Sequence, residues 1–182
     1  MIENGSVMNR ADVKQSLAEV GVVVGLVAAV VAMRFLPHPV NFSPVLAIMI
    51  FAGSVLTNRY LSFLVPLAGV LVSDLIIGIY EGMAFVYLAY ALTILMGRFV
   101  PSRKAWPIVA ASTFSSVLFF VLSNLGVWIF STMYDKTLEG LWLCYLMALP
   151  FFHYTFASTV IGSVVLFGVF GATYRFVLAP RH

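Results

Sequence analysis

Charged residues are scarce in this chain, and only 9% of its 182 residues are Asp, Glu, Lys or Arg. A soluble domain carries about 25% charged residues, so a water-exposed globular fold is excluded. Hydrophobic residues make up 62% of the chain, and its mean hydropathy is +1.05. We therefore expect an all-α membrane protein without a separate soluble domain.

Cysteine and enzyme motifs are also lacking. Cys144 is the single cysteine, which excludes an intramolecular disulfide and a metal site built from several cysteines. The chain contains no HExxH, no P-loop, no GxSxG and no acids and histidines at metal-ligand spacing. We expect no catalytic residue and no metal ligand, and therefore no enzyme. The net charge of +3 fits membrane topology, so we expect no nucleic-acid partner.

Long apolar runs are what the chain has instead. Six of them reach or approach the roughly 20 residues that a helix needs to cross a membrane. The six expected spans are Ala18–Leu36, Pro44–Leu56, Leu61–Ile79, Ala84–Val100, Trp106–Phe130 and Tyr154–Leu178. No small-residue cleavage site closes the first run, so we expect a retained helix and not a signal peptide.

A seventh apolar stretch, Leu141–Phe152, is too short to span and is bounded by Gly140 and Pro150. We expect it to form an interfacial or re-entrant piece packed beside the sixth span. The chain then divides into a polar cytoplasmic segment, a six-helix transmembrane domain and a short tail. Their bounds are residues 1–17, 18–178 and 179–182.

Basic residues set the orientation. With the N-terminus inside, eight Lys and Arg residues fall in inner segments, and only Arg34 and Lys136 fall in outer ones. This bias predicts that both termini are cytoplasmic. Four acids collect in the outer half, namely Asp74, Glu81, Asp135 and Glu139.

Asp74 lies inside the apolar run Leu61–Ile79, where a carboxylate costs roughly 2.5–3.5 kcal/mol on insertion scales. A chain keeps such a residue for a function or because it has a partner. The functional interpretation places Asp74 in an outward-facing pocket. The structural one satisfies it with Ser73, a backbone amide or Arg34. The inner halves of the spans hold no chain of titratable groups, so we do not expect a proton relay.

Three prolines in eight residues hold the segment 37–44 (PHPVNFSP) in extended or turn geometry. We expect Ser43 or Asn41 to cap the second helix, with Pro44 near its first position. The segment is either a rigid connector or a stiff loop that presents His38, Asn41 and Ser43 over an outward-facing cavity. In the second case a small ligand meets preformed donors at low ordering cost.

Further candidates for this cavity lie near the outer ends of the spans. Asn124 and Trp128 are one helical turn apart and share a face of the fifth span. Asn124 is either interhelical glue or a cavity donor. Tyr80 and Tyr87 either line the cavity or belong to an interfacial aromatic belt. His153 is either a ligand contact or a structural hydrogen bonder.

Small residues form a ridge on the first span. Such a ridge lets another helix approach closely. Its members are Gly21, Gly25, Ala28, Ala29 and Ala32. The ridge either packs inside the bundle or docks against a partner membrane protein.

The chain resembles a family of uncharacterised bacterial membrane proteins related to the substrate-binding (S) components of energy-coupling-factor (ECF) transporters. The resemblance covers roughly residues 34–170. It is carried by residues 35–45 (FLPHPVNFSPV), 65–67 (VPL), 73–74 (SD), Gly78, 83–87 (MAFVY), 97–98 (GR), 123–128 (SNLGVW) and 148–152 (ALPFF).

The resemblance implies a six-helix bundle in the bacterial inner membrane that binds a vitamin in a cavity near its outer surface. It also implies that small residues on the first helix dock onto a coupling membrane protein, which carries a pair of ATPases. Solitary S components for cobalamin use a cysteine near the outer end of the third helix as a cobalt ligand. This chain has Tyr80 in that region and no cysteine between residues 61 and 100, which argues against a corrinoid. If the chain nevertheless binds a corrin, His38 or His153 is the remaining candidate contact for it.

Our leading hypothesis is a substrate-capture subunit for uptake of a small, vitamin-like solute, surrounded by membrane lipids. The alternative is a non-transporting accessory subunit of a larger respiratory or photosynthetic membrane complex. In that case the small residues and aromatics bind other helices, lipid or pigment.

Overall fold

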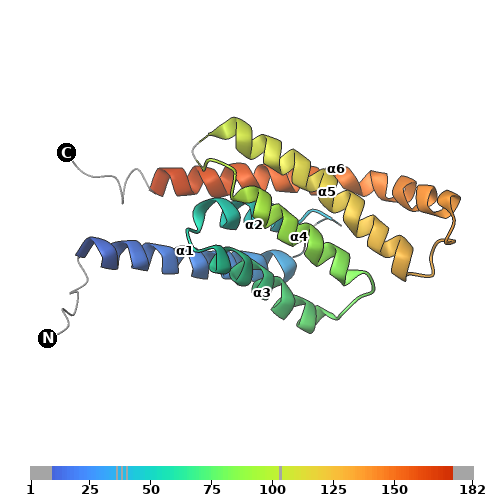
Figure 1. Ribbon diagram of the computed structural model, residues 1–182, viewed down its shortest axis with the longest axis horizontal. Helices are drawn as coiled ribbons and strands as arrows, with labels where there is room; N and C mark the ends of the chain where they lie inside the picture. The colour runs from blue at the N-terminus through green and yellow to red at the C-terminus, as the bar shows by residue number, and fades with distance from the viewer. Residues whose placement is uncertain (1–9, 36, 38, 40, 103, 174–182) are drawn as a thin grey trace, which may run out of the picture.

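The computed structural model describes residues 10–35, 37, 39, 41–102 and 104–173. These residues form α-helices and connecting segments, without a strand among them (Figure 1). The helices are α1 (Arg10–Phe35), α2 (Val45–Val55), α3 (Arg59–Ile77), α4 (Met83–Gly97), α5 (Ala105–Phe130) and α6 (Leu138–Thr173). The prediction of an all-α protein is confirmed for the described residues.

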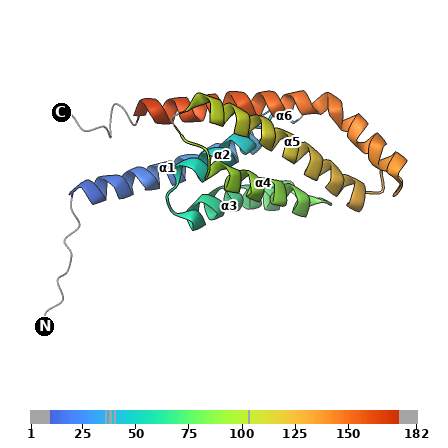
Figure 2. The same cartoon turned by 45° about the horizontal axis from the view of Figure 1, so that its top comes forward.

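Successive helices run in opposite directions, and their connections alternate between the two ends of the bundle (Figures 1 and 2). The start of α1 and the end of α6 therefore lie at the same end, where α3 and α5 begin and α4 finishes. We call this the basic end, because Arg59, Arg98 and Lys104 lie at these helix termini. The α5–α6 connection, with Asp135, lies at the opposite end, which we call the acidic end.

Three of the helices are long and apolar enough to cross a membrane. They are α3, α5 and α6, and the stretches with this length and apolar composition are Arg59–Ile77, Ala105–Phe130 and Leu138–Ala172. Only 28–33% of the residues in the most apolar part of each helix are buried inside the protein, so most residues there are partly or fully exposed. Lipid is the solvent that tolerates such a surface. Shorter apolar helical stretches run over Val24–Phe35, Val45–Val55 and Met83–Gly97.

The short helix α2 is the centre of the bundle. It packs against each of the other five helices, and all of its residues from Val45 to Gly53 are buried. A helix that is apolar all round is stable where protein surrounds it. The approach to α4 is close because both helices offer glycine. A Cβ on Gly53 would collide with the carbonyl oxygen of Ile94, and one on Gly97 would lie 2.5 Å from that of Ile50.

The sequence prediction was wrong for Leu141–Phe152, which is the first part of α6 and not a separate piece. Gly140 marks the start of this helix, where its N–H donates to Thr137 Oγ1 at 3.1 Å. Pro150 lies inside the helix. Proline inside a helix removes one backbone hydrogen bond and bends the helix. It is tolerated in membrane helices because neighbouring groups and local adjustments satisfy the backbone that it frees. Figure 2 shows α6 changing direction along its N-terminal part.

The described part of the chain covers the expected terminal segments only in part. Helix α1 begins at Arg10, so residues 10–17 of the expected polar segment are helical. Residues 174–182, which include the expected tail, lie outside the described part of the chain.

Candidate functional site

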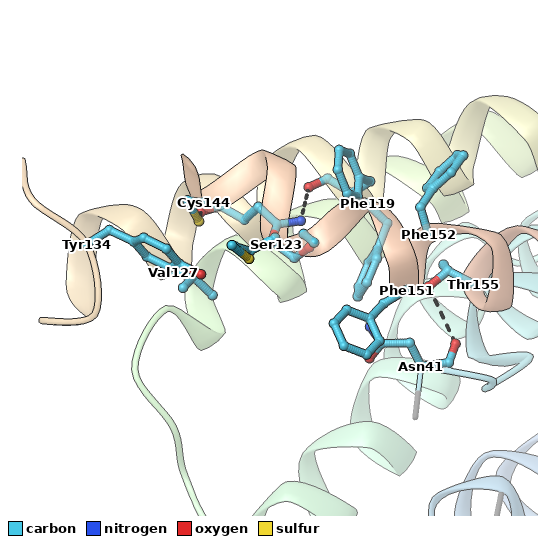
Figure 3. A pocket seen from close by; sticks show the side chains of 13 residues that line it. Asn41, Phe119, Ser123, Val127, Tyr134, Cys144, Phe151, Phe152 and Thr155 are labelled. Carbon is cyan, nitrogen blue, oxygen red and sulfur yellow. Dashed lines mark hydrogen bonds between the residues drawn. The ribbon is translucent and has the colours of Figure 1, made fainter. Parts of the chain in front are cut away.

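Two adjoining cavities lie between the loop that precedes α2 and the helices around it. The first, the aromatic cavity, has a volume of about 330 Å³ and lies between α5, α6 and this loop (Figure 3). The second, the arginine cavity, has a volume of about 270 Å³ and adjoins α1, α2 and α4. Both are lined by Asn41, Phe119 and Thr155. These three residues therefore mark the place where the cavities meet.

The aromatic cavity is lined mainly by ring and apolar side chains with a few polar groups between them. Its lining residues are Asn41, Phe119, Phe120, Ser123, Asn124, Val127, Tyr134, Cys144, Met147, Ala148, Phe151, Phe152 and Thr155. Phe120 and Phe152 pack edge to face, with ring centroids 5.2 Å apart. Apolar walls with a small number of placed polar groups are typical of small-molecule sites.

Asn124 is one of the residues that line this cavity. Its carboxamide Nδ2 donates to the carbonyl oxygen of Phe120, one turn earlier in α5, at 2.8 Å. The bond leaves the amide within its own helix, and so does not make it interhelical glue. Cys144, from α6, donates its thiol to the Asn124 carbonyl oxygen at 3.5 Å. The lone cysteine of the chain is therefore a buried wall of the cavity.

The arginine cavity contains a single charged side chain among the described residues that line it. Those residues are Met33, Arg34, Asn41, Ser43, Val45, Leu46, Ile77, Tyr90, Phe119 and Thr155. Tyr90 stacks on Phe119 with ring centroids 5.7 Å apart. This stack joins the walls of the two cavities.

Asp74 lies directly behind Arg34 and is fully buried. Its Oδ1 accepts a hydrogen bond from Arg34 Nη2, and its Oδ2 accepts one from the Tyr87 hydroxyl at 2.8 Å. Of the three partners considered from sequence, Arg34 is the one the structure provides, since the Ser73 hydroxyl donates to the Gly69 carbonyl oxygen instead. Asp74 and Tyr87 do not line either cavity. Asp74 holds Arg34 directly, and Tyr87 holds the second oxygen of Asp74.

The loop before α2 is held against α6 by backbone acceptors. The Thr155 hydroxyl donates to the Asn41 carbonyl oxygen at 3.4 Å, and the Ser158 hydroxyl donates to that of Ser43 at 3.2 Å. Asn41 has φ 63°, in the left-handed region that Asn tolerates better than most residues. The loop thus brings Asn41 and Ser43 to the cavities.

One prediction for this loop was wrong, and one of its predicted site residues lies outside the described part of the chain. Pro44 occupies the N-cap of α2, and no side chain caps the helix, so the expected cap by Ser43 or Asn41 was wrong. Their backbone carbonyls bond α6 instead. His38 lies outside the described residues.

Three other candidates lie away from the cavities. Trp128 donates its indole N–H to the Asp135 carbonyl oxygen at 2.9 Å, and so closes the α5–α6 connection. His153 is exposed on α6 beside the Tyr154 ring. Tyr80 is 41% exposed in the α3–α4 connection. Partial burial, followed by the charge of Asp74, raises the pKa of the Tyr80 phenol, which stays protonated near neutrality.

The small-residue ridge on α1 divides between two faces. Gly21, Gly25, Ala28 and Ala32 are exposed, whereas Ala29 packs against the core. A Cβ added to Gly21 or Gly25 would meet no atom within 4 Å. The bundle therefore leaves most of the ridge uncovered.

Comparison with protein families gives one match. The model of a family of unknown function, DUF6580, matches residues 14–179. The chain belongs to this family. The match includes every residue that lines the two cavities. No curated protein and no solved structure matches this DUF6580 chain.

Several lining residues of the DUF6580 site were missed from sequence. Phe119, Phe120, Phe151 and Phe152 were not among the predicted cavity residues, because the apolar residues around them in the sequence give no sign of a cavity. Their signal was the helical spacing of Phe119 with Ser123 and Val127, and of Ala148 with Phe152 and Thr155. That spacing in α6 is visible only when Pro150 is allowed inside a helix.

Proposed function

We propose that this DUF6580 protein is a membrane-embedded capture subunit that binds a small, vitamin-like solute for uptake, as S components of ECF transporters do. In this proposal all six helices cross the bacterial inner membrane, and both termini are cytoplasmic. The basic end then faces the cytoplasm, in agreement with the positive-inside rule. The acidic end, and with it the aromatic cavity, faces outward.

The observation that carries the proposal is the pair of adjoining cavities, which share three lining residues. Their volumes of about 330 and 270 Å³ add to a space of the size that small-molecule sites occupy, roughly 300–1,000 Å³. The walls of the aromatic cavity come from α5, α6, their connection and the loop before α2. The walls of the arginine cavity come from all six helices and the same loop, so a ligand that fills both would contact the whole bundle. Tyr80, which stands where cobalamin S components carry a cysteine, lines neither cavity, so we favour a solute other than a corrinoid.

Release of a bound solute needs a partner, because the chain contains no nucleotide-binding motif. The exposed small residues of α1 support docking of a coupling membrane protein with its ATPases, because they permit a close helix approach. The same face supports the second candidate, an accessory subunit of a larger respiratory or photosynthetic complex. In that role the cavities hold lipid or pigment.

Purification from native membranes separates the two roles. Mass spectrometry of the extracted protein should find a stoichiometric small polar solute for a capture subunit. Retention within a respiratory or photosynthetic complex, with only lipid or pigment bound, would contradict it.

The cavity assignment has its own matched variants. Phe152→Ala removes a ring from the aromatic cavity, whereas Phe156→Ala removes one that lines neither cavity. We expect the first to release the co-purifying solute and the second to retain it. Equal retention by both variants would place the solute elsewhere.

A further inference from the structure

The two cavities differ in chemistry, and the difference specifies a ligand class. The aromatic cavity offers ring faces and the polar groups of Ser123 and Asn124. The arginine cavity offers one cation, Arg34, and no described acid lines either space. A ligand that fills both therefore meets rings at one end and a guanidinium at the other.

Arg34 has donor capacity that its partner does not use. A guanidinium carries five N–H donors, and Asp74 accepts from Nη2 alone. The Nε–H is buried and has no acceptor in the part of the chain that the structure describes. A buried donor without an acceptor is costly, and more so when it is charged. The side chain is nevertheless held in place, with 16% of it exposed.

Asp74 does not satisfy Arg34 completely, because it is shared. Its second oxygen accepts from Tyr87, and Asp74 lines neither cavity, whereas Arg34 lines the arginine cavity. The pair keeps the guanidinium charged and oriented, while the unused donors remain for another acceptor. A carboxylate fits these donors in charge and in planar geometry.

We propose that the solute is a small aromatic or heteroaromatic carboxylate, with its acid group on Arg34 and its ring in the aromatic cavity. The molecule would pass the junction formed by Asn41, Phe119 and Thr155, where the carboxamide and hydroxyl can hydrogen-bond ring heteroatoms. This inference rests on the proposed capture function and adds the class of substrate.

Cys144 supplies a built-in reporter, because it is the only thiol in the chain and lines the aromatic cavity. The experiment measures the rate of N-ethylmaleimide labelling of the full chain in nanodiscs. The added compounds are nicotinate, 1-naphthylacetate and 4-(indol-3-yl)butanoate, each with its carboxamide, together with decanoate and tryptamine. Extraction of the native solute runs in parallel.

We expect at least one ring carboxylate to slow labelling at a concentration about tenfold to hundredfold lower than its carboxamide, as a charge-assisted bond to Arg34 predicts. Arg34→Gln should abolish this preference, and Arg34→Lys should restore part of it. Arg59→Gln removes the same charge at an exposed position away from both cavities and should leave the preference intact. Where Arg34→Gln does not fold, Arg34→Lys and the acid–amide comparison in the unaltered chain still decide the question.

The outcomes separate this inference from the proposed function. If carboxamides or tryptamine protect Cys144 as well as the acids do, the inference that the ligand is a carboxylate is overturned. The proposed solute capture is then unaffected. If decanoate protects Cys144 as well as the ring carboxylates do, the inference that the ligand contains an aromatic ring is overturned, and a fatty acid is indicated. Labelling unaffected by every compound, with no solute in the native extract, overturns both.

Discussion

Replacing Asp74 with Asn should lower the free energy of unfolding by about 3 kcal/mol. Asp74 is fully buried and Arg34 is 16% exposed, so the change leaves a largely desolvated guanidinium without its counter-ion. Removal of one partner of a buried ion pair costs about 3–5 kcal/mol. We expect the lower end, because Asn keeps one oxygen that can accept from Arg34 Nη2.

Comparison with neighbouring bonds shows whether charge is the cause. Tyr87→Phe removes only the 2.8 Å hydrogen bond to Asp74 and should cost about 1–2 kcal/mol. Ser73→Ala is the matched control, because its hydroxyl bonds a carbonyl in its own helix; it should cost less than about 1 kcal/mol. The double variant Asp74→Asn/Arg34→Gln removes both charges and should be more stable than Asp74→Asn alone.

The assay is reversible unfolding in mixed detergent micelles, followed by tryptophan fluorescence for the four variants of the Asp74/Arg34 cycle. A coupling energy of about 2 kcal/mol or more is expected, well above the roughly 0.6 kcal/mol typical of neutral interhelical bonds. A coupling energy below about 1 kcal/mol would refute the reasoning. So would equal losses for Asp74→Asn and Ser73→Ala.

Two further predictions concern glycine. Gly53→Ala and Gly97→Ala should each lower the free energy of unfolding by about 1–3 kcal/mol, because the added methyl group meets the backbone of the facing helix. Gly168→Ala is the control and should not destabilise the protein, because its added methyl group meets no atom within 4 Å. An equal effect of all three substitutions in the same assay would contradict close α2–α4 packing. Gly21→Leu and Gly25→Leu should leave stability unchanged, since a Cβ meets nothing there, but should abolish co-purification of a coupling protein. Undiminished co-purification would place the partner elsewhere.

The helices were predictable from sequence because hydrophobic length is a direct requirement of the membrane. Each of the six expected spans coincides in large part with one helix, and the glycines and prolines between them gave most of the helix bounds. The failure at Leu141–Phe152 has a physical cause. Pro150 and Gly140 normally interrupt helices, but neighbouring helices support a bent helix through Pro150, and Gly140 lies at a start and not at an end.

The site was predictable only where a residue was costly in its surroundings. Asp74 stood out because a carboxylate is expensive in an apolar run, and its pairing with Arg34 was among the alternatives. Aromatic lining residues such as Phe120 and Phe152 carry no such cost, so composition could not separate them from lipid-facing positions. Their role depends on how α5 and α6 face each other, which is a property of the packed bundle.

Burial of Asp74 also changes what its presence means. A carboxylate that lined the cavity would repel anions and favour a cationic solute. Asp74 instead lies behind Arg34, with both oxygens occupied, and presents the guanidinium to the cavity in its place. Under our proposal the acid that first marks the site in the sequence therefore favours a ligand of its own charge, because it holds the cation that would bind that ligand.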